Sequence, residues 1–169
     1  SGNSNHVNLS WSTPSVGNYS VYTDGSPSQA IFYRLSREGT LLTEDYQSTS
    51  FTDSDLSNNT LYDYELESYS VVGAASSVFD DALTLPGTPE FTENVPDLNE
   101  ITLNWTDADD TGDDGDITYT LERQWSADEG SYSATLVSSY AEQTYTDMNL
   151  LNSTGFNYRV RAYNSTGYS

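Results

Sequence analysis

Aspartates crowd one short stretch in the second half of the chain. Residues 107–116 read DADDTGDDGD, and their six carboxylates belong to Asp107, Asp109, Asp110, Asp113, Asp114 and Asp116. Ca²⁺ relieves the repulsion among such groups because it takes about six to eight oxygen ligands, and Mg²⁺ fits less well because it demands stricter geometry. Thr111 and Thr118 stand where an EF-hand has a ligand and its closing Glu. The stretch therefore predicts a calcium loop of another kind, with a solvated acidic loop as the alternative.

A second acidic group, which is a weaker candidate for a cation site, lies near the middle of the sequence. Asp80 and Asp81 are adjacent, and Asp97 or Glu100 would have to join them to complete a cation site. Ordinary surface charge is the favoured interpretation here, because two neighbouring carboxylates alone rarely hold a cation.

Attachment of glycans is the second chemistry that the sequence offers. Sequons of the form N-x-S/T mark accessible asparagines in secreted proteins. They occur at Asn8, Asn18, Asn58, Asn104, Asn152 and Asn164. We expect N-glycosylation at these sites if the host has the machinery, with Asn58 and Asn152 as the best acceptors because NNT and NST are turn sequences.

Catalysis is not expected. The chain has no Cys, and its one histidine, His6, lies outside any cluster, so neither a catalytic triad nor a His-based metal site can be assembled. Carboxylate pairs alone would suffice for glycoside hydrolysis, but an acidic loop can place two at any distance, so that signal is non-specific.

The charge balance restricts the partners. Against 26 Asp and Glu stand five basic residues, all Arg, which gives a formal net charge of −21. Nucleic acid and anionic membrane surfaces are excluded as partners because both require clustered cations. No apolar run is long enough to cross a membrane. An acidic coat suited to a salty environment and a calcium-binding surface both remain open.

The elements that must position these residues are β-strands that occur twice. In Phe156, Tyr158, Val160 and Ala162, apolar residues alternate with polar ones, which predicts a strand with one buried face. Tyr62, Tyr64 and Leu66 show the same pattern 94 residues earlier, and Trp11 and Trp105 share that spacing. The chain therefore carries one module twice.

The linker TLPGTPE (84–90) marks the predicted boundary, because its prolines cannot continue a central strand. The first module spans residues 1–85 and the second spans 86–169. Strands are expected at residues 6–12, 29–37, 50–53, 62–68, 75–85, 91–95, 101–105, 117–124, 132–137, 143–147 and 156–164. The fold class is all-β, with two tandem immunoglobulin-like sandwiches.

These residues resemble the fibronectin type III family. The resemblance is carried by a core Trp, by a Leu six residues before a corner Tyr, and by a strand of the form Y-x-Y-R-V-x-A-x-N-x-x-G. The matching residues are Trp11, Leu56, Tyr62, Tyr64 and Leu66 in the first copy, and Trp105, Leu150, Phe156, Tyr158, Val160, Ala162, Asn164 and Gly167 in the second. Phe156 departs from the pattern because it lacks the hydroxyl of the corner Tyr, which Tyr62 retains.

The two copies differ at their ends. Too few residues precede Trp11 for an opening strand, and too few follow Gly167 for a closing one. We therefore expect the first strand of module one and the last strand of module two to be missing. They would be supplied by a longer repeat array or by strand exchange with neighbouring copies.

Two functions from different classes fit the sequence. The first is a structural module of an extracellular or cell-surface fibre, adhesin or surface-layer protein, stabilised by calcium and carrying N-linked glycans. Its partners would be neighbouring copies or modules of the same protein. The second is an accessory carbohydrate-binding or spacer module of a secreted polysaccharide-degrading enzyme. Trp125, Tyr132 and Tyr140 would then be candidates for stacking on sugar rings, although edge packing of a hairpin is the favoured interpretation of all three.

Overall fold

The protein is all-β. A computed structural model describes residues 5–14, 30–70, 73–108, 116–125 and 134–169, and within these ranges it has strands and turns but no helix. Contacts divide the chain into two compact units. The first comprises Ser1–Leu56 and Leu61–Ala82, and the second comprises Ser57–Thr60 and Leu83–Ser169. The short turn at residues 57–60 is thus grouped with the second unit.

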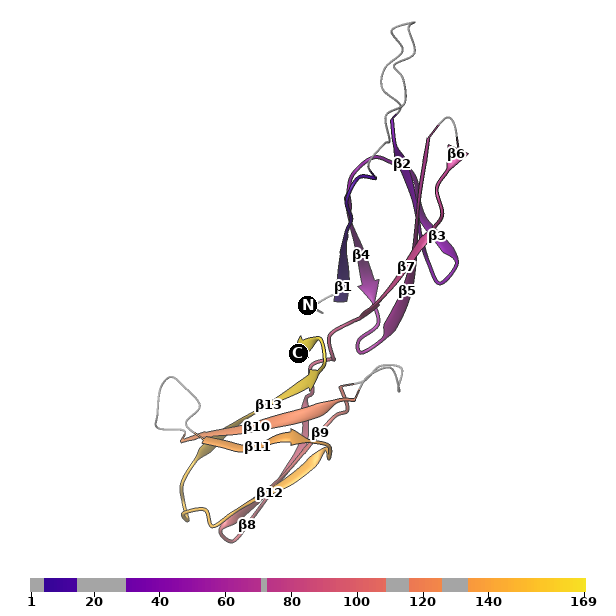
Figure 1. Cartoon of the computed structure of the whole chain (residues 1–169). Helices are drawn as coiled ribbons and strands as arrows, with labels where there is room; N and C mark the ends of the chain where they lie inside the picture. The colour runs from indigo at the N-terminus through magenta and orange to yellow at the C-terminus, as the bar shows by residue number, and fades with distance from the viewer. Residues whose placement is uncertain (1–4, 15–29, 71–72, 109–115, 126–133) are drawn as a thin grey trace, which may run out of the picture. The chain divides into compact units, whose positions relative to one another are not determined.

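The first unit has two antiparallel layers (Figure 1). One layer pairs β1 (Asn5–Ser10) with β4 (Ser50–Leu56). The other contains β3 (Thr40–Tyr46), β2 (Phe32–Arg37), β5 (Leu61–Ser70), β6 (Gly73–Ala74) and β7 (Val78–Leu83). Tyr33, Leu35 and Tyr64 are buried between the layers, and the indole of Trp11 meets the Tyr33 ring edge-on at 5.4 Å between centroids.

The second unit repeats this plan with one more strand on the smaller sheet. That sheet has the order β12 (Thr144–Met148), β9 (Glu100–Trp105), β8 (Phe91–Asp97). The larger sheet has the order β11 (Ala134–Tyr140), β10 (Thr118–Trp125), β13 (Phe156–Asn164), β14 (Gly167–Tyr168). Pro96 lies in β8, an edge strand, where the ladder tolerates a missing N–H.

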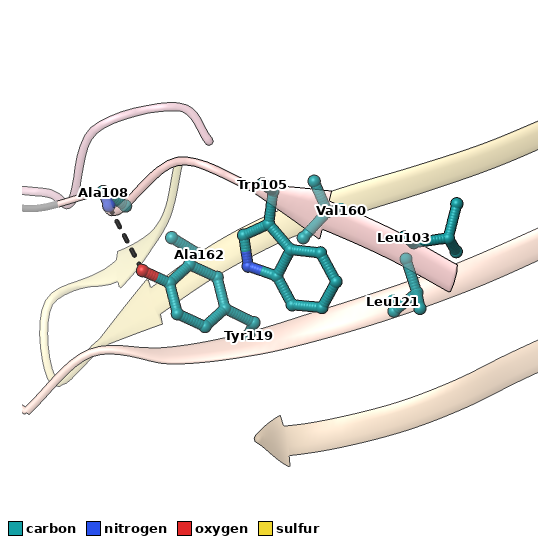
Figure 2. Packing of buried hydrophobic residues seen from close by; sticks show 7 residues of the cluster. All are labelled: Leu103, Trp105, Ala108, Tyr119, Leu121, Val160 and Ala162. Atoms are coloured by element: carbon teal, nitrogen blue, oxygen red, sulfur yellow. Dashed lines mark hydrogen bonds between the residues drawn. The ribbon is translucent and has the colours of Figure 1, made fainter. Parts of the chain in front are cut away.

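The core of the second unit forms where the two sheets face each other. Figure 2 shows Trp105 beside Tyr119, with Leu103, Leu121, Val160 and Ala162 around them. Each of these residues alternates along its strand with more exposed neighbours, as a period of two requires. The phenol of Tyr119 is 1% exposed and accepts a 3.2 Å hydrogen bond from the backbone N–H of Ala108.

The backbone conformation repeats at the same spacing as the sequence. Three pairs of non-glycine residues with positive φ recur at the 94-residue spacing: Asp45 and Ser139, Asp55 and Asn149, and Asn59 and Ser153. The first pair coincides with register shifts in the β2–β3 and β10–β11 ladders. Because positive φ is uncommon in non-glycine residues, this recurrence shows that turns and bulges were duplicated together with the strands.

The two units differ in their terminal strands. Within the described residues β1 pairs only with β4, whereas its counterpart β9 pairs with both β12 and β8. Gly167–Tyr168 pairs with β13 as β14, at the place that β6 (Gly73–Ala74) has beside β5 in the first unit. Among the described residues of the second unit, no strand corresponds to β7, which follows β6 in the first unit.

Candidate functional sites

A buried polar cluster of the same composition joins the two sheets of each sandwich. In the first unit, Asp53 on β4 accepts a 2.7 Å bond from Arg37 on β2 and a 2.9 Å bond from the Tyr64 hydroxyl on β5. Asp53 is 7% exposed. The Arg37 guanidinium carbon also lies 5.2 Å from the ring centroid of Tyr62, within the range of a cation–π contact. We call this Arg–Asp–Tyr arrangement an inter-sheet cluster.

The inter-sheet cluster of the second unit has the same parts. Asp147 on β12 accepts two bonds from Nη1 of Arg123 on β10, at 2.9 and 2.8 Å, and a 2.9 Å bond from the Tyr158 hydroxyl on β13. Asp147 is 4% exposed. The guanidinium carbon of Arg123 lies 5.2 Å from the ring of Phe156, the counterpart of Tyr62. The hydroxyl that Phe156 lacks is therefore not needed for this contact.

The two tyrosines of these clusters are held in their neutral form. Burial, and then the hydrogen bond to the neighbouring carboxylate, raises the pKa of Tyr64 and of Tyr158 well above the ordinary value. An ionised phenol would face a buried carboxylate at hydrogen-bond distance, which explains the direction of the shift. The clusters thus link the two sheets of each sandwich through hydrogen bonds and an ion pair.

Sequence reasoning missed these clusters as units. Asp53 and Asp147 share the 94-residue spacing, as do Tyr64 and Tyr158, and each Asp is the one buried acidic residue among the described residues of its unit. That repetition of an acid at an inward position of a strand is a signal that could have found them.

Ion pairs between Arg and Glu lie on the outward faces of the larger sheets. Arg34 pairs with Glu44 and, at 2.9 Å, with Glu67. Glu122 pairs with Arg159 at 2.8 Å and with Arg161 at 3.4 Å. Together with the two inter-sheet clusters, these contacts engage all five arginines of the chain. Each arginine therefore has an acidic partner in the structure.

Only the two ends of the acidic loop fall within the described residues. The Asp107 carboxylate accepts hydrogen bonds from the Tyr119 hydroxyl and from the Ala108 N–H, both at 2.7 Å, and Asp116 is exposed. The remaining loop aspartates, Asp109, Asp110, Asp113 and Asp114, lie outside the described ranges. No group of three metal-binding side chains occurs among the described residues. The calcium loop stays a prediction.

The weaker acidic group is divided between the units. Asp80 and Asp81 lie exposed on β7 in the first unit, where the Asp80 carboxylate accepts the backbone N–H of Asp81 at 3.0 Å. Asp97 and Glu100 belong to the second unit, at the turn joining β8 to β9. Asp80 and Asp81 therefore belong to one sandwich, and Asp97 and Glu100 belong to the other.

The sequons differ sharply in accessibility. Asn8 and Asn152 are exposed. Asn58 and Asn104 are half-buried, and the Asn104 amide donates to the Glu93 carbonyl at 3.3 Å. Asn18 lies outside the described residues.

Asn164 is a poor acceptor in the folded protein, contrary to expectation. Its side chain is 1% exposed, and its Nδ2 donates to Asn59 Oδ1 at 2.9 Å and to the Thr84 carbonyl at 2.8 Å. Its Oδ1 accepts the backbone N–H groups of Thr166 and Gly167 at the turn into β14. Asn59 and Thr84 are themselves 0% and 2% exposed and belong to the same unit. The nitrogen that would carry a glycan is therefore committed to a buried polar network.

The aromatic candidates are only partly available. Trp125 is 45% exposed and meets the ring of Phe156 edge-on at 6.0 Å. Tyr140 is half-buried, with its hydroxyl donating to the Thr144 carbonyl, and Tyr132 lies outside the described residues. The pair formed by Tyr163 and Tyr168, which are 41% and 50% exposed, lies elsewhere on the larger sheet of the second unit.

His6 is exposed on β1. In the part of the chain that the structure describes, no helix is long and apolar enough to cross a membrane.

The known proteins that the chain resembles are matched over only part of their own length. No family model matches the chain. Over 130 residues, 70% of the chain, it is 31% identical to Exoglucanase B of Cellulomonas fimi, and it spans 11% of that protein's length. Among solved structures, the FN1–FN3 domains of chicken CNTN1 match with a TM-score of 0.40 and 18% identity, over 82% of this chain and 52% of that one.

The strand arrangement, taken together with the repeated Trp, Leu and Tyr motifs, identifies the modules. In the second unit a three-stranded and a four-stranded antiparallel sheet enclose one core, and the described part of the first unit repeats the plan without the third strand of the smaller sheet. This is a sandwich of the type that fibronectin type III domains share with immunoglobulin domains. The chain consists of two tandem fibronectin type III-like β-sandwiches.

Proposed function

We propose that the chain is a non-catalytic structural pair of modules within a longer extracellular or cell-surface protein. The observation that carries the proposal is the duplicated inter-sheet cluster. In each sandwich, the buried carboxylate of Asp53 or Asp147 spans the two sheets in a chain without cysteine. The polar groups best placed for chemistry are thereby committed to holding the fold.

The composition supports a location outside the cell. The surface is strongly acidic, with a formal net charge of −21 and no lysine, and exposed sequons are present at Asn8 and Asn152. Such a charge destabilises a compact state by self-repulsion unless salt or divalent cations screen it. Calcium in the acidic loop between Asp107 and Asp116 would serve that purpose, and N-linked glycans would extend the modules' surface.

A second candidate is favoured by a specific observation. The relative with 31% identity is named an exoglucanase, and the matched part is 11% of its length. The chain would then be an accessory spacer or carbohydrate-binding pair in a secreted polysaccharide-degrading enzyme. As a structural pair of modules, the chain would have neighbouring copies or modules of the same protein as its partners. As an accessory pair, it would have the glycan substrate of the enzyme as its partner.

Single-molecule extension of the 169-residue chain tests the structural role. Each sandwich should unfold as a separate force event that releases a contour length of about 300 Å, since an extended chain spans about 3.3–3.6 Å per residue. Asp147→Asn should weaken one event and leave the other at its original force. Extension without force peaks, or turnover of a polysaccharide by the purified chain, would refute the role.

A further inference from the structure

A pair of aromatic rings projects from the outer face of the larger sheet in each sandwich. In the first unit, Phe32 on β2 faces Tyr69 on β5 across the ladder, with ring centroids 5.8 Å apart and planes 30° from parallel. In the second unit, Tyr163 on β13 faces Tyr168 on β14, with centroids 4.8 Å apart and an interplanar angle of 51°. We call these pairs the first and second aromatic platforms.

Strand alternation shows that both platforms face outward. Tyr33 and Leu35 are each 2% exposed, so the alternate positions of β2, including Phe32, point away from the core, although Phe32 and its partner Tyr69 are both half-buried. Ala162 is 0% exposed, which places its neighbour Tyr163 on the outer face, where it is 41% exposed. Tyr168 lies directly opposite Tyr163 and is 50% exposed. Cross-strand partners in register share a face of the sheet.

Each platform carries an arginine stacked on one ring. The guanidinium carbon of Arg34 lies 5.6 Å from the ring centroid of Tyr69, and that of Arg161 lies 4.9 Å from the ring centroid of Tyr168. Arg34 is paired with Glu44 and Glu67, and Arg161 with Glu122. A platform thus combines two neighbouring aromatic rings with a rim of ion-paired Arg and Glu side chains.

The two platforms share one equivalent residue and are otherwise assembled from different strands. Tyr69 and Tyr163 are 94 positions apart, as the duplication requires. Their ring partners are not equivalent: Phe32 comes from β2 on one side of β5, whereas Tyr168 comes from β14 on the far side of β13 from β10. The stacked arginines also come from different strand positions. The arrangement therefore recurs although the partner residues do not.

We propose that these platforms bind a neutral polysaccharide of equatorially linked pyranose rings. Such rings have flat C–H faces, which pack on aromatic rings, and hydroxyl groups at the edge, which exchange hydrogen bonds with the Arg and Glu rim. Anionic polymers are disfavoured because the chain carries a net charge of −21 and each platform arginine is already paired. The proposal deepens the second candidate function, and the structural role does not depend on it.

Two soluble polymers with the same β-1,4-glucan backbone make a matched pair of probes. Hydroxyethyl cellulose is neutral and carboxymethyl cellulose is anionic. In native affinity gels, the 169-residue chain should be retarded by the neutral polymer and not by the anionic one. Absence of retardation by hydroxyethyl cellulose, or equal retardation by both polymers, overturns the proposal.

Substitutions then locate the binding surface. Tyr163→Ala combined with Tyr168→Ala, and separately Tyr69→Ala, should each weaken retention by about tenfold, since an aromatic contact contributes about 0.5–1.5 kcal/mol beyond its area. Tyr163→Phe combined with Tyr168→Phe keeps the rings and should retain binding. Leu98→Ala is the control, because Leu98 is 77% exposed in the turn that joins two strands of the smaller sheet.

Melting temperatures of all variants establish that they are folded. Unchanged retention in a folded variant lacking Tyr69, Tyr163 and Tyr168 overturns the proposal, and so does an equal loss in Leu98→Ala. Loss of binding with an unchanged force profile would leave the structural role standing, so the two proposals fail separately.

Discussion

Neutralising Asp147 should destabilise the second sandwich strongly. Asp147→Asn keeps the side-chain shape and removes the charge that Arg123 faces at 2.8 and 2.9 Å. The Asp147 side chain is 5% exposed and that of Arg123 is 24% exposed. Breaking a buried ion pair costs about 3–5 kcal/mol because it leaves an uncompensated charge. Since Arg123 retains some contact with water, we expect a loss at the lower end, about 3 kcal/mol.

Glu122→Gln is the matched control for this change. It also removes one carboxylate that pairs with arginine in the second unit, so both variants alter the net charge equally. The Glu122 side chain is 13% exposed, but its partners Arg159 and Arg161 are 44% and 37% exposed and so remain hydrated more fully than Arg123, and ion pairs open to water contribute about 0–1 kcal/mol. The two substitutions therefore separate the effect of burial from the effect of charge number.

Urea denaturation and calorimetry of the 169-residue chain provide the measurement, with hydrogen exchange to assign each transition to a unit. A loss of about 3 kcal/mol lowers the melting temperature of a domain of this size by about 10 °C or more. Asp53→Asn should produce the corresponding loss in the first unit. The reasoning is refuted if Glu122→Gln destabilises as much as Asp147→Asn, or if Asp147→Asn costs less than about 0.5 kcal/mol.

Three further outcomes follow from the same structure. The raised pKa of Tyr64 and Tyr158 stabilises the folded state fully at pH values below the tyrosine pKa of the unfolded chain, about 10, and this stability is lost as the pH rises towards the pKa of the folded state. Replacing both tyrosines by Phe should therefore reduce the fall in the urea concentration at half-unfolding that occurs at alkaline pH. Adding calcium should raise the melting temperature and a chelator should reverse this, and a null effect with no bound ion by mass spectrometry would count against the acidic loop as a metal site. In a glycosylating host, Asn152→Gln should remove one glycan mass while Asn164→Gln should leave the mass of attached glycan unchanged and lower stability. A glycan mapped to Asn164 in folded protein would contradict the buried network.

Local pattern was sufficient for the fold. The alternation in residues 156–162, the repeat of Trp11 at Trp105 and the proline-rich linker predicted two all-β sandwiches, because a strand's period of two and a turn's residue preferences are properties of neighbouring residues. The same patterns placed Leu56 and Leu150 in the cores, and both are 8% exposed.

Partners distant in sequence were decided only by the tertiary structure. Asp147 meets Arg123 from 24 positions away, and Asn164 meets Asn59 from 105 positions away. Neither pairing follows from composition, because every acidic residue in so anionic a chain is a plausible surface charge until the sheets stack. The amide of Asn164 reads as a glycan acceptor in sequence and becomes a buried hydrogen-bond donor once the segments at residues 59, 84 and 164 pack together. Burial determines which polar groups must find partners, and burial is a property of the packed sheets rather than of any single strand.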